Sequence, residues 1–360
     1  MRGGGGLWHR VGVVDAHRLA PRRRRGCRVS EIFAFDSAEH DPGDAFARYC
    51  ALYAHGADVE RTADPFFARV RSWRLDRTLL FDREYGGARH HRRERVTQDG
   101  FDHFVLHHVV SGELVGGSDG AAVPIAAGEI LLLDTREPME SCARSVQLIT
   151  VSLARDAVRA AAGNLDGLHG RRIGAREGAL LSALLRALVE QASHLSPNAQ
   201  AAVTRTLVDL LSVAINPVGT GARSDFYRLE YVRREAAQRL IEAHLAAADF
   251  SVQDIVKATG ISRASLYRLF ESQGGVARFI QLRRLQQLRE RLDDRAFDGQ
   301  SLAELAPLSG FSGESHASRL FKQAFGVSPG AYRAASIRSG LIPSVDLMAR
   351  RWANSLRELS

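Results

Sequence analysis

Two groups of side chains near the C-terminal end of the sequence have the types that read the edges of DNA bases. Arginine can pair with guanine through two hydrogen bonds, glutamate can accept one from cytosine, serine is versatile, and alanine and tyrosine can touch the thymine methyl group. In each group the spacing is i, i+1, i+4 and i+5, which leaves all four side chains on one face of a helix. The groups are Arg263, Ala264, Tyr267 and Arg268 and, 51 residues later, Glu314, Ser315, Ser318 and Arg319.

Both groups lie in an internal repeat. The segment 251–262 aligns with 301–312 at a constant offset of 50, and Arg268-Leu269-Phe270 aligns with Arg319-Leu320-Phe321 at an offset of 51. The same supersecondary unit therefore occurs twice, with one residue inserted in the second copy.

Each copy has the features of a helix-turn-helix. A short amphipathic helix leads to a turn at Gly260 or Gly310, where glycine suits a positive φ. Ser262 and Ser312 are then expected to cap the second helix, whose outward face carries the base-reading types. A helical hairpin with a solvated polar face is the alternative, but two copies in phase disfavour it. An amphipathic helix over 276–292 joins the copies and predicts two readers in successive major-groove segments, about 34 Å apart.

At these residues the chain resembles the AraC/XylS family of bacterial transcription regulators. The resemblance covers about 231–335 and rests on Gly310-Phe311-Ser312, Ser315-His316, Ser318-Arg319, Phe321-Lys322, Phe325 to Pro329 and Tyr332-Arg333. It implies a DNA-binding domain of two helix-turn-helix units, with the eight residues named above facing the bases. Pro307 departs from the family pattern, because proline inside the first helix of the second copy removes a backbone donor and can bend that helix.

The N-terminal half predicts a small β-barrel or sandwich followed by helices. Short apolar runs broken by Gly and Asp are typical of antiparallel strands, and we expect strands at 104–110, 113–115, 121–125, 130–134 and 145–153. Leucine stripes over 180–188 and 203–211 then repeat at helical spacing and either pack on the barrel or form a dimer interface. Residues 126–135 resemble the cupin-like, effector-binding half of the same regulators, which implies dimerisation through these helices.

An enzyme is the competing class, because many cupins hold a catalytic metal. Such a site needs two His one residue apart with a Glu on one strand and a further His on a later strand. The histidines here are His90-His91, His103 and His107-His108; neighbours point to opposite faces of a strand, although His103 and His107 could share one. We therefore predict no metal, no cofactor and no catalytic residue.

Five aromatic and charged groups of this half are of the kinds that line a small-molecule pocket, although each of them also suits packing or surface. They are Trp73, Arg83, His91, Phe104 and His107. The sequence assigns none of them to an effector, whose identity stays unknown.

Composition excludes several classes. With 45% hydrophobic and 25% charged residues, the 360-residue chain is neither collagen-like, disordered nor disulfide-rich. No stretch approaches the roughly 18 to 20 apolar residues of a membrane span. The cysteines, Cys27, Cys50 and Cys142, form no C-x-x-C pair, which favours a reducing cytosol and excludes the zinc-binding cysteine cluster of a DNA-repair methyltransferase.

The formal net charge of +8 is a poor guide to DNA binding here. Residues 1–30 hold eight arginines against one aspartate, whereas 225–335 carries a net charge of only +3. The pattern of the repeat, rather than charge, therefore supports DNA binding. The head, 1–30, has little apolar periodicity and is expected to be disordered. Three interpretations of the head remain open: an arm that binds DNA phosphates, a mitochondrial leader, and an upstream extension without a role.

Together these observations predict an α+β multidomain protein: a cupin-like β-barrel with dimerisation helices, then an all-α domain of two helix-turn-helix units. The predicted division is a head (1–30), a sensor and dimerisation domain (45–215), a linker (216–226), a DNA-binding domain (227–335) and a tail (336–360). The expected function is a cytoplasmic, sequence-specific transcription regulator, an activator that responds to a small-molecule effector. Its expected partners are promoter DNA, a second copy of the chain and, by resemblance, RNA polymerase. A ligand-independent regulator whose barrel only dimerises or binds a protein is the alternative.

Overall fold

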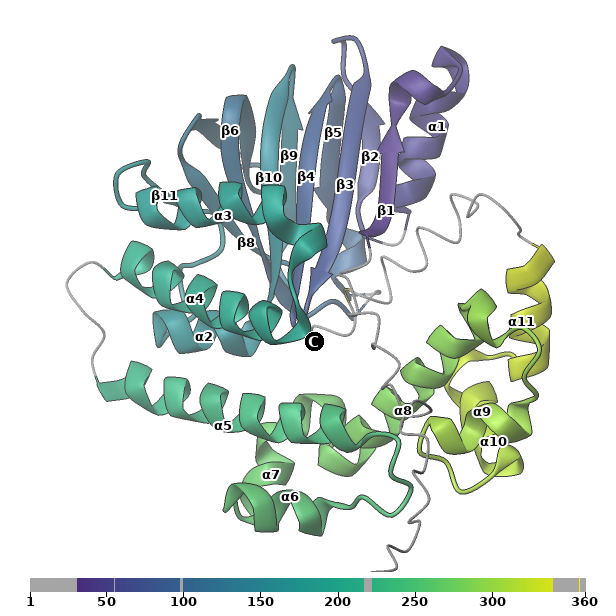
Figure 1. Cartoon of the computed structure of the whole chain (residues 1–360). Coiled ribbons are helices and arrows are strands. Elements are labelled where there is room, and N and C mark those ends of the chain that lie inside the picture. Colours follow the sequence, from purple (N-terminus) through teal and green to yellow (C-terminus); the bar gives the residue numbers. More distant parts are fainter. Residues whose placement is uncertain (1–30, 55, 98–99, 217–221, 339–355, 357–360) are drawn as a thin grey trace, which may run out of the picture.

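The computed structural model describes residues 31–54, 56–97, 100–216, 222–338 and 356. Its N-terminal half is an eleven-stranded antiparallel sheet curled into a half-barrel, and its C-terminal half is a bundle of helices (Figure 1). This confirms the predicted α+β class. The strands are β1 (Glu31–Asp36), β2 (Asp58–Arg61), β3 (Phe67–Leu75), β4 (Thr78–Gly86), β5 (Ala88–Arg92), β6 (His103–Ser118), β7 (Val123–Ala126), β8 (Ile130–Asp134), β9 (Met139–Ala143), β10 (Val146–Ala154) and β11 (Arg171–Ile173).

The long strand β6 holds the two sides of the half-barrel together. Its first part pairs with β8 and β10, and its second part pairs with β7 and β9. The change falls near Gly112, whose φ is +78° and where a Cβ would lie 2.3 Å from the Ser145 carbonyl oxygen. A glycine is required at this bend because no side chain fits there. The two strands predicted at 104–110 and 113–115 are therefore one bent strand.

Other strand predictions differ in detail. The expected strands at 130–134 and 145–153 correspond to β8 and β10, and the one at 121–125 corresponds to β7. Strand β9, between β8 and β10, was not predicted, and neither were β1 to β5 or β11. Of these, β1 is partly exposed and β9 interleaves small and polar residues, so that their apolar alternation is weak.

Helices cover the sheet on its two faces. These are α1 (Pro42–Tyr53), α2 (Arg155–Ala162), α3 (Ala179–Gln191) and α4 (Pro197–Ile215). One core lies between the sheet and α2, α3 and α4, and it buries Leu181, Leu185 and Leu207. The leucine stripes thus pack on the barrel, as the first of the two interpretations requires. The other core fills the half-barrel beneath α1 and includes the buried Leu356.

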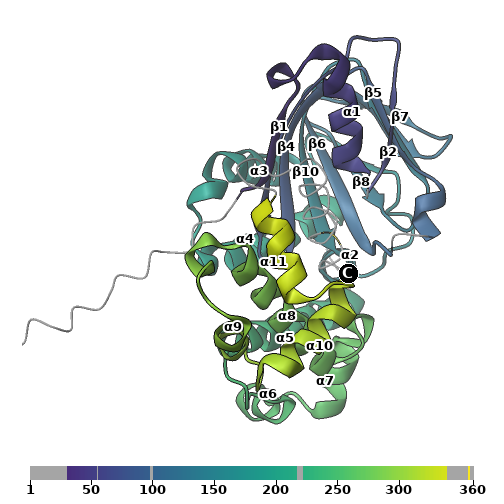
Figure 2. The ribbon, with the colours of Figure 1, turned by 90° about the vertical axis from the view of Figure 1, so that its right-hand side faces the viewer.

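The C-terminal half contains two helix pairs that share one helix. It comprises α5 (Ala222–His244), α6 (Val252–Thr259), α7 (Arg263–Leu269), α8 (Val276–Asp293), α9 (Leu302–Leu308), α10 (Glu314–Phe325) and α11 (Pro329–Arg338), which lie together below the sheet (Figure 2). The start of α8, with Val276 and Phe279, belongs to the core of α5, α6 and α7. Its second part, with Leu285 and Leu288, belongs to the core of α9 and α10. A single continuous helix therefore fixes the distance between the two pairs.

Some of the predicted domain boundaries agree only partly with the structure. Helix α5 begins at Ala222, so the last residues of the predicted linker, 216–226, are helical. No glycine or proline follows Gly221 until Gly260, and the chain is free to continue as a helix there. Residues 31–44, which the sequence left unassigned, form β1 and the start of α1. The head, 1–30, and the tail beyond Arg338, except Leu356, lie outside the described residues. None of the helices within the described ranges is long and apolar enough to cross a membrane.

Candidate DNA interface and sensor pocket

The first reader helix, α7, presents its predicted face to solvent. Ser262 is its N-cap, with the hydroxyl oxygen accepting from the Ser265 backbone N–H at 3.2 Å. Leu266 and Phe270 are fully buried in the first core, so the opposite side of the helix faces outward. Arg263, Ala264 and Tyr267 are exposed on that side, and the Arg263 guanidinium lies 5.8 Å from the centre of the Tyr267 ring.

Arg268 is also exposed but has a partner in the protein. Its Nη2 lies 3.3 Å from Oε1 of Glu230 on α5. The same side chain lines a polar cleft between the two halves of the molecule, together with Arg136 and Arg159 of the sensor half. Of the four residues predicted to face bases on α7, Arg268 is therefore the one that must change partner to reach DNA.

The second reader helix, α10, has the same arrangement, but its predicted N-cap needs a correction. Ala317 and Phe321 are fully buried, whereas Glu314, Ser315 and Arg319 are exposed and Ser318 is half-buried. The predicted cap, Ser312, is wrong by one residue, because the N-cap is Gly313. The Ser312 hydroxyl instead lies 3.3 Å from Nδ1 of His316. The extra residue in the second copy displaces the helix start, which the alignment of the repeat placed one position too early.

The two turns follow the backbone geometry that the glycines allow. Gly260 ends α6 in the left-handed conformation, with φ of +68°, and Gly310 has φ of +77°. At Gly310 a Cβ would also lie 1.9 Å from the Leu245 carbonyl oxygen, so the turn packs directly on the end of α5. Pro307 lies in the last turn of α9, and Phe311 beyond it remains buried. The proline therefore leaves the core of the second pair closed.

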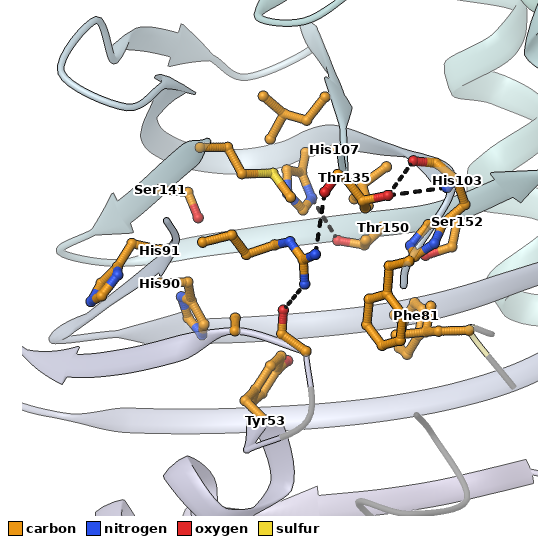
Figure 3. A pocket seen from close by; sticks show the side chains of 18 of the residues that line it. Tyr53, Phe81, His90, His91, His103, His107, Thr135, Ser141, Thr150 and Ser152 are labelled. Carbon is orange, nitrogen blue, oxygen red and sulfur yellow. Dashed lines mark hydrogen bonds between the residues drawn. The ribbon is translucent and has the colours of Figure 1, made fainter. Parts of the chain in front are cut away.

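The half-barrel encloses a cavity with about 700 Å³ of empty space, part of it open to solvent. Alternate residues of three strands face it: Phe81 and Arg83 of β4, His103, Val105 and His107 of β6, and Thr150 and Ser152 of β10. Figure 3 shows His90 and His91 at one end of this cavity and Phe81 at the other. A lining of apolar, aromatic and a few hydrogen-bonding side chains is typical of a small-molecule site.

Three histidines of the cavity, His90, His103 and His107, are neutral near pH 7. Burial, with Arg92 and Arg155 nearby for His103 and Arg83 nearby for His107, lowers the pKa of each imidazole to about 3. Burial and Arg83 also hold the pKa of His90 well below its usual range. Hydrogen bonds orient two of the rings: His90 Nε2 lies 2.9 Å from the Tyr49 hydroxyl, and His107 Nδ1 lies 2.9 Å from Thr150 Oγ1.

Three of the five predicted pocket residues line the cavity. Arg83, His91 and His107 do so. Trp73 and Phe104 point to the opposite face of the sheet, into the core beneath the helices, where Trp73 Nε1 donates to Ser193 Oγ at 3.1 Å. Sequence reasoning also missed lining residues outside this set, such as Tyr53 and Phe101. Tyr53 ends helix α1 and Phe101 precedes β6, so neither lies in a strand whose alternation could have indicated it.

The histidines do not form a metal site. Within the described part of the chain, no three His, Cys, Asp or Glu side chains are placed to hold a metal ion. His108 lies on the other face of β6 from His107, with its Nδ1 3.4 Å from Ser182 Oγ of α3. What the cavity offers is hydrogen bonding, apolar surface and two guanidiniums, those of Arg83 and of Arg92, the second of which donates to backbone carbonyl oxygens.

A buried ionic cluster joins the sensor half to the DNA-binding half. Asp156 of α2 accepts from Arg77 at 2.8 and 2.9 Å and lies 3.0 Å from Nη1 of Arg234 on α5. Burial acts to raise the pKa of Asp156, but the two arginines hold it well below its usual range. The Arg234 guanidinium in turn lies 5.4 Å from the centre of the Phe270 ring at the end of α7. No pattern in the sequence indicated this cluster, since its members come from three distant segments.

Two helix pairs rigidly joined by α8, each with a polar outward face, define a DNA-binding protein, and the half-barrel beside them carries a small-molecule cavity. This combination defines a transcription regulator with a separate sensor half. The model of the AraC-binding-like domain matches residues 44–215, and that of a helix-turn-helix domain matches residues 255–335.

Known proteins agree with this class. The transcriptional activator NphR of Rhodococcus sp. is 28% identical over an alignment of 257 residues, and the match covers 68% of this chain and 74% of NphR. The crystal structure of the AraC-like transcriptional activator CuxR matches with a TM-score of 0.50 and 22% identity, covering 72% of this chain and 94% of CuxR. The chain belongs to the AraC family of transcriptional regulators. These relatives are regulators rather than enzymes, in agreement with the prediction from the sequence.

Proposed function

We propose that this protein is an effector-responsive activator that binds promoter DNA as a homodimer, contacts RNA polymerase and acts in the bacterial cytoplasm. The observation that supports it most is the shared helix α8, which presents α7 and α10 as two readers at a fixed separation. In this proposal residues 45–215 form the sensor and dimerisation domain, and residues 227–335 form the DNA-binding domain. NphR and CuxR are both named as activators, which favours activation over repression.

The proposed base contacts are the exposed polar faces of the two readers. They comprise Arg263, Ala264, Tyr267 and Arg268 in the first and Glu314, Ser315, Ser318 and Arg319 in the second. Arg268 reaches a base only by leaving Glu230, which exchanges an exposed ion pair of small value for a bidentate base contact. In the free protein Arg268 is thus paired with Glu230, and this proposed base contact forms only after that ion pair breaks.

The proposed sensor is the cavity of the half-barrel. An effector shifts the balance between two arrangements only if it binds one of them more tightly. The cluster of Asp156, Arg77 and Arg234 supplies a physical connection, because it touches the sensor half and, through Phe270, the end of α7. For dimerisation, the apolar Leu180 and Val213 of α3 and α4 are 65% and 55% exposed and supply surface for a second copy.

Footprinting tests the DNA-binding arrangement. The purified full chain is incubated with the intergenic DNA beside its own gene, and we expect two protected segments about one helical turn apart for each copy of the protein. Arg263→Ala and Arg319→Ala should each weaken protection of one segment, whereas Arg278→Ala, an exposed arginine on α8 outside both readers, should leave the pattern unchanged. Loss of both segments in either variant would contradict the assignment of one reader to each segment.

A reporter assay tests the sensor. The same intergenic region drives a reporter with and without metabolites from neighbouring operons, and the protein is tested with the same compounds by thermal shift. Activation that needs a compound, and a thermal shift by that compound, support the proposal. Activation of equal size without any compound would favour the ligand-independent regulator whose barrel only dimerises or binds a protein.

A further inference from the structure

The cavity of the half-barrel contains a buried positive charge for which no carboxylate of the described residues supplies a counter-charge. Arg83 lies on β4 and is only 6% exposed. Its Nη2 makes two long contacts with neutral groups, 3.5 Å to the Tyr49 hydroxyl and 3.4 Å to His90 Nε2, and its Nε has no hydrogen-bond partner. Among the described residues, no carboxylate forms an ion pair with this guanidinium.

Other buried arginines of the sensor half and its junction have well-placed protein partners. Arg92, in the same cavity wall, donates to the carbonyl oxygens of Gly56 and Thr135. Arg77 pairs with Asp156 at 2.8 Å, Arg155 pairs with Asp134, and Arg234 pairs with Asp156 at 3.0 Å. Burial of an unpaired charge is unfavourable, which explains these partners. The long, neutral contacts of Arg83 therefore call for a reason, and its position in the wall of the half-barrel cavity suggests a ligand.

The surroundings of Arg83 favour an anion. The guanidinium carbon lies 5.3 Å from the centre of the Tyr53 ring and 5.0 Å from that of Tyr85, and such aromatic contacts attract the cation without neutralising it. The neighbouring histidines are neutral, as shown above, so they add hydrogen bonds but no negative charge. Glu140 is the carboxylate among the lining residues, and it is already 3.3 Å from Arg89 on the neighbouring strand. The net charge of the cavity is positive.

The rest of the wall limits the ligand to one small anionic group on an apolar body. Phe81, Phe101, Val105, Leu133 and Met139 provide the apolar surface. The hydroxyls of Thr150 and Ser152 are at the same end as Phe81 (Figure 3). A phosphate dianion would need more donors than the free edge of one arginine, whereas a carboxylate needs one charged partner and one or two further donors.

We propose that the cavity takes a small organic monocarboxylate with an aromatic or aliphatic body, and that Arg83 holds the carboxylate. This assignment rests on the sensor role proposed above and adds the chemical class of the effector. Binding supplies the counter-charge that the protein omits, so the bound form gains a charge-assisted hydrogen bond in a low-dielectric site. A neutral analogue of the same shape gains only the burial of its apolar body.

The test uses the full chain and a panel of aromatic and aliphatic monocarboxylates of six to ten carbons, each with its matching primary amide. Thermal shift and isothermal calorimetry measure binding. We expect at least one acid to stabilise the protein and to bind roughly tenfold or more tightly than its amide. Arg83→Met should abolish this preference, whereas Arg69→Met, an exposed arginine on the adjacent strand β3, should keep it.

A second measurement does not depend on the choice of acid. Because Met removes an unpaired buried charge and preserves the length of the side chain, ligand-free Arg83→Met should unfold at the same temperature as the parent or higher. A lower unfolding temperature would show that Arg83 is a structural residue and would overturn the proposal.

The remaining outcomes separate the two proposals. Two outcomes overturn the anion class and leave the sensor role standing. One is equal binding of an acid and its amide. The other is that no acid binds, while a neutral or cationic compound stabilises the protein and activates the reporter. Reporter activation that no compound changes, with no thermal shift by any of them, overturns both.

Discussion

Lowering the pH should destabilise the sensor half through its buried histidines. His103 and His107 have a pKa near 3 in the folded protein and an ordinary value of 6.5 when unfolded. Below pH 6.5 the unfolded chain therefore binds more protons than the folded one, and stability falls with pH at about 1.4 kcal/mol per unit for each histidine. Between pH 7 and pH 5 this amounts to about 2 kcal/mol for each, or about 4 kcal/mol together. Typical domains have a total of about 5 to 15 kcal/mol.

Urea denaturation at pH 7, 6 and 5 measures this loss, followed by fluorescence to which the buried Trp73 contributes. The decisive comparison is His107→Gln, which keeps a hydrogen-bonding group beside Thr150 but does not titrate. We expect its free energy of unfolding to fall by about 2 kcal/mol less than that of the parent over this range. His194→Gln, an exposed histidine, should behave as the parent. Equal pH dependence of parent and His107→Gln would refute the reasoning, because it would mean that His107 is protonated alike in both states.

Three further predictions concern the DNA-binding half and the head. Arg268→Ala should cost about 1 to 3 kcal/mol on the cognate site and much less on random DNA, measured by fluorescence anisotropy; an equal loss on both would make Arg268 a phosphate contact. Leu288→Ala, at a fully buried position of α8, should destabilise the second helix pair by about 2 to 5 kcal/mol in chemical denaturation, whereas an unchanged midpoint would show that α9 and α10 do not pack on it. Deletion of residues 1–30 should leave operator affinity and its salt dependence unchanged, whereas weaker binding with a shallower salt dependence would show that the arginines of the head grip phosphates.

The repeat could be found from the sequence because its signals are local. Gly260 and Gly310 mark turns that need positive φ, and the serines at 251 and 301 form capping boxes with Asp254 and Glu304. Each signal depends on residues within four positions of one another, so the order of residues is sufficient to recognise it. Ser312 was misplaced by one residue because an insertion between copies shifts a boundary without changing the pattern on either side.

The alternation of residue types located several strands, but it could not tell which face of a strand lines the cavity and which lies beneath the helices. In β6 the odd-numbered His103, Val105 and His107 line the cavity, whereas Phe104 and His108 lie beneath the helices. Apolar residues occur on both faces, because helices cover one and the half-barrel encloses the other. Alternation alone therefore could not tell Trp73 and Phe104, which are core residues, from Arg83 and His107, which are lining residues.

The sequence by itself determined the class of this protein: helical period, caps and two glycine turns specify two helix pairs, and short apolar runs specify a sheet. Only the tertiary structure decided what the sensor half contains. The guanidinium of Arg83, which has no carboxylate partner among the described residues, and the cluster of Asp156, Arg77 and Arg234 depend on which distant segments meet. Whether a buried charge has a partner is a property of three-dimensional distance, and the order of residues along the chain does not contain that distance.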